Sequence, residues 1–129
     1  MVKVFVNGTF DILHTGHLKL LAYAKSLGEV TVGIDSDVRV RSLKGSSRPI
    51  NNQQERTEML MALKYVDRVV VFNTDKELVD LVCECDIMVK GNDYKGKRIV
   101  GQDVCKQIIF FDRIDGFSTT AKIQDIADR

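Results

Sequence analysis

Residues 8–17, with the sequence GTFDILHTGH, hold both histidines of the chain between an apolar run and a helical pattern. His14 and His17 are three residues apart, so at the start of a helix they share one face. The free N–H groups and the dipole of a helix start favour an anion. Gly8 and Gly16 allow the backbone to approach a ligand closely. The segment therefore predicts a cluster of donors suited to phosphate oxygens.

The spacing of the two histidines leaves other interpretations open. They are also compatible with structural histidines on a surface or with part of a metal site. A zinc site needs further ligands, and Cys83, the nearest cysteine in sequence, is far along the chain. The segment lacks G-x-G-x-x-G, so a dinucleotide fingerprint is absent. From the residues alone we prefer phosphate binding, then structural histidines, then a metal.

Strand and helix patterns alternate about five times along the chain. The expected strands are residues 2–6, 30–34, 68–72, 87–89 and 108–111. The expected helices are residues 17–27, 37–43 (as a short helix or a turn), 53–63 and 76–82, with a last helix that begins at Ser118. This alternation predicts an α/β fold: a single-domain, Rossmann-like open parallel sheet over residues 1–129, with helices on both faces. Ligands of such sheets bind beyond the carboxyl ends of the strands.

Composition narrows the classes of function. A chain of 129 residues can bury a core without disulfides, and a net charge of +1 argues against a general nucleic-acid binder. No secretory signal and no apolar stretch near the ~20 residues of a membrane helix is visible. The three cysteines show no framework spacing, so we expect reduced thiols. We therefore expect a cytoplasmic protein that binds neither membrane nor nucleic acid.

Four segments, in order, resemble one superfamily. The run GTFDILHTGH looks like the HxGH signature of the nucleotidyltransferases that include the cytidylyltransferases. Residues 41–50 (RSLKGSSRPI) with Glu55 and Arg56 resemble the basic loop and helix of the ADP-heptose synthase nucleotidyltransferase domain. Residues 89–94 (VKGNDY) are similar to that domain's VKGxDY stretch. Residues 116–120 (GFSTT) resemble a GxSTT run shared with the glycerol-3-phosphate cytidylyltransferases. The match covers essentially the whole chain.

The resemblance implies a nucleotidyltransferase domain and assigns roles to individual residues. The catalytic residues it implies are His14, His17 and Lys44. The nucleotide-binding residues it implies are Gly8, Thr9, Phe10, Gly16, Arg113, Ser118, Thr119 and Thr120. The substrate-binding residues it implies are Asp11, Arg56, Lys90, Gly91 and Asp93. The chain itself is expected to supply no metal site, with Mg²⁺ bound mainly through the triphosphate.

Different motifs of the sequence resemble families that use different substrates. The residue 41–50 loop and VKGNDY are similar to the heptose family, which adenylylates heptose 1-phosphate with ATP. Arg113 instead resembles an arginine of glycerol-3-phosphate cytidylyltransferase, which uses CTP. We favour the heptose reaction and keep the cytidylyl reaction as the alternative, with flavin adenylylation and a non-catalytic nucleotide-binding module behind them. The implied partners are a nucleoside triphosphate, a phosphorylated small acceptor and, by resemblance, a second copy in a homodimer.

Overall fold

Five parallel strands form the sheet within residues 1–112, which are the part of the chain that the computed structural model describes. The strands are β1 (Lys3–Gly8), β2 (Glu29–Asp35), β3 (Arg68–Phe72), β4 (Ile87–Gly91) and β5 (Ile108–Phe111). The helices are α1 (Thr15–Leu27), α2 (Asp37–Lys44), α3 (Gln53–Met61), α4 (Asp75–Cys83) and the short 3₁₀ helix η1 (Asn92–Tyr94).

The strand order β3-β2-β1-β4-β5 places the first strand at the centre of the sheet. The chain builds outward from β1 through β2 to β3, then returns to add β4 on the other side of β1. All four strand pairs are parallel. The direction of winding therefore reverses between β1 and β4, which is where an open α/β sheet leaves a crevice for a ligand.

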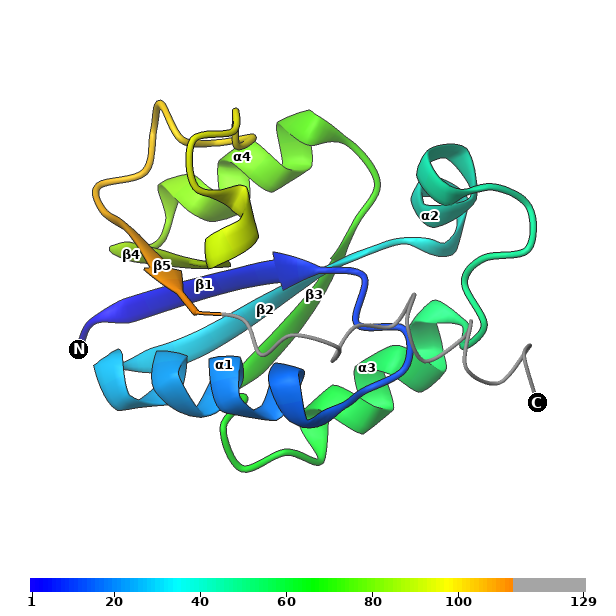
Figure 1. Cartoon of the computed structure of the whole chain (residues 1–129), viewed down its shortest axis with the longest axis horizontal. Helices are drawn as coiled ribbons and strands as arrows, with labels where there is room; N and C mark the ends of the chain where they lie inside the picture. Colours follow the sequence, from blue (N-terminus) through cyan, green and yellow to red (C-terminus); the bar gives the residue numbers. More distant parts are fainter. Residues whose placement is uncertain (113–129) are drawn as a thin grey trace.

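Helices cover both faces of the sheet (Figure 1). Alternate residues of a strand point to opposite faces. Val4 and Val6 of β1 therefore pack on the side of α1 and α3, with Leu21 and Leu60. Phe5 packs on the side of α4, with a separate group of buried residues that includes Phe72, Leu78, Val82 and Met88. Burial on both faces explains why the strands read as continuous apolar runs.

The predicted fold class is confirmed, and the predicted elements within residues 1–112 are present with shifted ends. The first helix begins at Thr15, two residues earlier than expected, because the His14 side chain caps it. The third helix ends at Met61 with Ala62 as its C-cap, two residues earlier than expected. Gly28 is the C-cap of α1. The expected final helix from Ser118 lies outside the described residues.

Gly33 of β2 provides a test of the core. A Cβ at this position would lie 2.6 Å from Cζ of Phe5 and 3.4 Å from Cε1 of Phe72, both fully buried. We expect Gly33→Ala to lower the free energy of unfolding in urea by about 1–3 kcal/mol through overpacking. Phe5→Leu removes Cζ, so the double variant should lose less stability than the sum of the two single variants. Strict additivity would contradict this account of the packing.

Candidate functional site

A cavity of about 260 Å³ opens beyond the carboxyl ends of β1 and β4. It lies at the reversal of winding, where the fold favours ligand binding. Ten of the residues predicted from the sequence line it: Gly8, Thr9, Phe10, His14, Gly16, His17, Lys44, Lys90, Gly91 and Asp93. The structure therefore brings together three segments, the β1–α1 junction, the end of α2 and the end of β4.

Other lining residues were not predicted from the sequence. They are Val6, Asn7, Leu20, Val89, Tyr94 and Phe111. The apolar members belong to strands or helices and read as ordinary core positions. Asn7 directly precedes Gly8 at the end of an apolar run, and Tyr94 ends the VKGNDY stretch. Their position at the ends of strands was the available signal.

The two histidines begin α1 and hold each other in place. His14 is the N-cap, and its Nδ1 accepts a hydrogen bond from the Gly16 N–H at 3.1 Å. The His17 Nδ1 in turn accepts from the His14 N–H at 3.3 Å. This is the reciprocal arrangement of a capping box, made with imidazoles in place of hydroxyl and carboxylate groups. The two rings stack with centroids 3.8 Å apart and an interplanar angle of 23°.

These bonds determine the tautomer of both rings. A nitrogen that accepts a hydrogen bond carries no proton, so each neutral imidazole has its proton on Nε2. Each ring can therefore donate through Nε2 while the backbone holds its Nδ1. Two imidazole donors at a helix start that lines a cavity are suited to phosphoryl oxygens.

Phe10 supports this arrangement from the preceding loop. Its φ of 50° lies in the left-handed region, which a non-glycine residue adopts at a cost of about 1–3 kcal/mol. Its ring contacts the His17 ring at 5.0 Å between centroids. A Cβ at Gly8 would lie 3.2 Å from the edge of the Phe10 ring, so a larger residue at position 8 would displace that ring. Gly8 thus makes room for an aromatic side chain as well as lining the cavity.

Lys44 is the last residue of α2, and its side chain lines the cavity. Removal of water around its ammonium lowers its pKa, and the nearby positive charge of Arg48 lowers it further. The charges of Asp35 and Asp11 act in the opposite direction. Lys44 therefore brings to the cavity a positive charge that feels the repulsion of Arg48, and an anion in the cavity would offset that repulsion.

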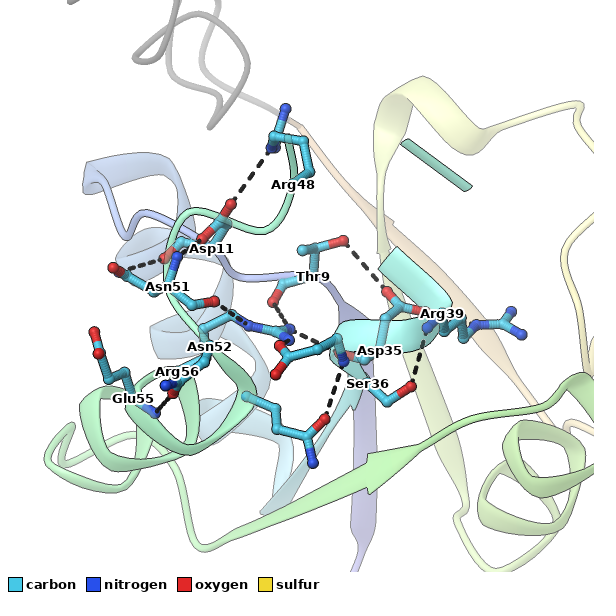
Figure 2. Close-up of polar contacts among 12 residues, drawn as sticks. Thr9, Asp11, Asp35, Ser36, Arg39, Arg48, Asn51, Asn52, Glu55 and Arg56 are labelled. Carbon is cyan, nitrogen blue, oxygen red and sulfur yellow. Dashed lines mark hydrogen bonds and ion pairs between the residues drawn. The ribbon is translucent and has the colours of Figure 1, made fainter. Parts of the chain in front are cut away.

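Arg56 is buried, and it is not among the residues that line the cavity. Figure 2 shows its polar contacts. Its guanidinium donates to the carbonyls of Asn51 at 3.0 Å, Thr9 at 2.9 Å and Asp35 at 2.8 Å. It also donates to a carboxylate oxygen of Asp37 at 2.8 Å. These partners belong to the β1–α1 junction, the end of β2, the start of α2 and the loop before α3. The resemblance implied a substrate contact, whereas the geometry gives this arginine a positioning role.

Asp11 also connects the β1–α1 junction to the loop before α3 (Figure 2). Its side chain is fully buried, and its two oxygens accept from the N–H groups of Ile50 at 2.8 Å and Asn51 at 2.8 Å. The guanidinium of Arg48 lies 3.4 Å away. Asp11 does not line the cavity, so it too fits a positioning role better than the implied substrate contact.

Gly91 and Asp93 line the cavity after β4. A Cβ at Gly91 would lie 2.6 Å from a carboxylate oxygen of Asp93, so any larger residue would displace that carboxylate. Lys90, the residue before Gly91, is buried beside Asn7 and Tyr94. Arg113, Ser118, Thr119 and Thr120 lie outside the described residues.

Within residues 1–112, no group of three or more histidine, cysteine or carboxylate side chains is arranged to hold a metal ion. Asp11 is the carboxylate of the β1–α1 loop, and its oxygens accept hydrogen bonds from backbone N–H groups. None of the described helices has the length and apolar character needed to cross a membrane.

Comparison with known proteins shows which family this chain resembles. Residues 5–124 match the model of a family described as Cytidylyltransferase-like. The Bifunctional protein HldE of a Nitratiruptor species is 51% identical over 124 residues, which cover 94% of this chain and 27% of that protein. The Bifunctional protein HldE of Campylobacter concisus is 48% identical over 128 residues, which cover 97% of this chain and 27% of that protein. The chain therefore spans about a quarter of the length of these curated relatives.

A solved structure is also similar. It is the crystal structure of the lipopolysaccharide core biosynthesis protein from Thermoplasma volcanium GSS1, with a TM-score of 0.72 and 28% sequence identity. The alignment covers 89% of this chain and 99% of that one. The five-stranded parallel sheet with helices on both faces is thus shared with a protein of similar length.

The Arg56 network predicts a large loss of stability when its guanidinium is removed. Arg56→Ala leaves three carbonyls and the Asp37 carboxylate without this donor. We therefore expect the free energy of unfolding in urea to fall by about 3–5 kcal/mol. Arg98→Ala is the matched control, because it breaks an exposed arginine–aspartate pair and should change little. Equal stability of the two variants would show that the network contributes nothing to folding.

Proposed function

Because the chain belongs to the cytidylyltransferase-like family, we propose that it is a nucleotidyltransferase that transfers an adenylyl group from ATP to heptose 1-phosphate. The products are an ADP-activated sugar and pyrophosphate. The observation that carries this proposal is the stacked histidine pair at the start of α1, which lines the cavity together with Lys44 and Lys90. Four cationic or donor side chains around one small cavity suit two substrates that both carry phosphate.

The reaction needs positioning and charge stabilisation more than covalent chemistry. An oxygen of the acceptor phosphate attacks the α-phosphorus of ATP, and the bond from that phosphorus to the β-phosphate bridging oxygen breaks. Negative charge grows on the leaving pyrophosphate and on the transferred group. The Nε2–H groups of His14 and His17 donate to these oxygens, and their orientation is set beforehand by the bonds at Nδ1.

Lys44 supplies a positive charge to the same cavity, where it neutralises phosphoryl oxygens as they approach. Mg²⁺, when bound through the triphosphate, neutralises charge on the leaving pyrophosphate. Asp93 follows Gly91 at the cavity wall and can accept a hydrogen bond from a sugar hydroxyl. Asp11 and Arg56 hold the loops that carry these groups.

The heptose acceptor is supported by the similarity of the 41–50 loop and of VKGNDY to the ADP-heptose synthase domain. The description of the structural neighbour as a lipopolysaccharide core biosynthesis protein also favours a sugar. The alternative, CDP-glycerol formation from CTP and glycerol 3-phosphate, rests on Arg113. A non-catalytic module is disfavoured because the histidine pair and Lys44 are all retained at the cavity. By family resemblance we also expect a homodimer in the cytoplasm.

Pyrophosphate release tests the proposed reaction. With Mg²⁺ present, ATP and CTP are each combined with heptose 1-phosphate and with glycerol 3-phosphate. We expect turnover with ATP and heptose 1-phosphate, since the loop and strand-end motifs favour that pair. Turnover only with CTP and glycerol 3-phosphate would establish the alternative. Folded protein that binds a triphosphate but turns over none of the four pairs would support the non-catalytic module.

The histidines can be removed without removing the helix cap. His14→Ser combined with His17→Gln rebuilds an ordinary capping box, so the free energy of unfolding should change by less than about 1 kcal/mol. Each single substitution should still lower pyrophosphate release by about 10²–10³-fold, because one aligned donor is lost. Near-normal turnover of the double variant would mean that the imidazoles only cap α1.

A further inference from the structure

Lys90 is a buried cation at the wall of the cavity. It lies near the end of β4, and only 7% of its surface is exposed. β4 is the neighbour of β1 in the sheet, and the direction of winding reverses between these two strands. Lys90 therefore lines the cavity from β4, whereas the histidines line it from the segment that follows β1. The histidine pair and Lys90 thus approach the same cavity from different elements of the fold.

Within the described part of the chain, two side chains contact its ammonium. Asn7 Oδ1 accepts a hydrogen bond from Nζ at 3.3 Å, and the Tyr94 ring lies 4.1 Å from Nζ to its centroid. An ammonium has three donors. Within residues 1–112, Asn7 is the only hydrogen-bond acceptor of Lys90, and no carboxylate lies within ion-pair distance of it. The charge is held in place by an amide oxygen and an aromatic face, without a counter-ion from this part of the chain.

Such a placement is costly for the protein alone. A buried charge without a paired opposite charge destabilises a fold, and an apolar residue of similar volume commonly does better. Burial lowers the pKa of Lys90, while the more distant charges of Asp35 and Asp93 act in the opposite direction. A negatively charged ligand in the cavity would supply the missing counter-charge.

We propose that Lys90, Asn7 and Tyr94 form a phosphoryl-binding subsite separate from the start of α1. Asn7 Oδ1 and the Tyr94 ring orient the ammonium, and its remaining donors bind oxygens of the phosphoryl group. The inference rests on the proposed function, which brings two phosphorylated ligands into this cavity. The group comes from the triphosphate or from the acceptor phosphate, and the test below separates these sources.

Binding measurements test the subsite without requiring turnover. The affinities of ATP with Mg²⁺ and of heptose 1-phosphate are measured by calorimetry for the wild type and for Lys90→Met. We expect at least a tenfold loss of affinity for one of the ligands, together with a melting temperature that does not fall. Lys76→Met, on the exposed lysine of α4, removes the same charge from a solvent-exposed side chain and should leave both affinities within twofold.

Asn7→Asp is a second variant that keeps Lys90 in place. The new carboxylate provides an internal counter-ion 3.3 Å from Nζ in the wild-type geometry, so it should compete with the phosphoryl group and weaken the same ligand. A structural role of Lys90 alone predicts the opposite pattern, in which Lys90→Met melts earlier and Asn7→Asp binds normally.

Each outcome decides the assignment. Weaker binding of heptose 1-phosphate alone places the acceptor phosphate at Lys90, and weaker binding of ATP alone places the triphosphate there. Affinities for both ligands that stay within twofold in Lys90→Met would overturn the subsite. Wild-type protein that turns over no acceptor but whose ATP affinity depends on Lys90 would keep the subsite and reject the heptose reaction. Wild-type protein that binds neither ligand would overturn both proposals.

Discussion

The buried guanidinium of Arg56 is the contact on which the geometry of the site depends most. It donates to the β1–α1 junction, to the end of β2, to the start of α2 and to the loop before α3 (Figure 2). The β1–α1 junction carries the histidines, and α2 ends with Lys44. Since a buried arginine that lacks its acceptors is strongly unfavourable, the four segments keep their relative positions or the domain loses stability. Asp11 reinforces the same arrangement with the opposite charge.

The cations that line the cavity are placed in a different way. The chain as a whole is nearly neutral, with a net charge of +1, so attraction for phosphates has to be created locally. Lys44 stands beside Arg48, and Lys90 is buried against an amide and a ring. Both arrangements leave positive charge incompletely balanced within the described part of the chain. A phosphorylated substrate of the proposed reaction would supply the missing negative charge.

The two histidines both cap the start of α1 and line the cavity. Its Nδ1 atoms satisfy backbone N–H groups that every helix start leaves unpaired, so the rings are held rigidly before any ligand arrives. Phe10, in a left-handed conformation, places a third ring against His17. Rigid donors are what charge stabilisation requires, because little reorganisation is then needed during the reaction.

The alternation of strand and helix patterns in the sequence determined the fold class, and the spacing of the histidines indicated the junction that holds them. Most of the cavity-lining residues were implied by the family resemblance, which rests on short local motifs. It did not distinguish residues that face the cavity from residues that face the protein. Arg56 and Asp11 belong to the same motifs as Lys44, yet they point into the loops, and Asn7 was missed although it holds Lys90. Only the tertiary structure decided these roles, because they depend on which carbonyls and amides distant segments bring within hydrogen-bond distance.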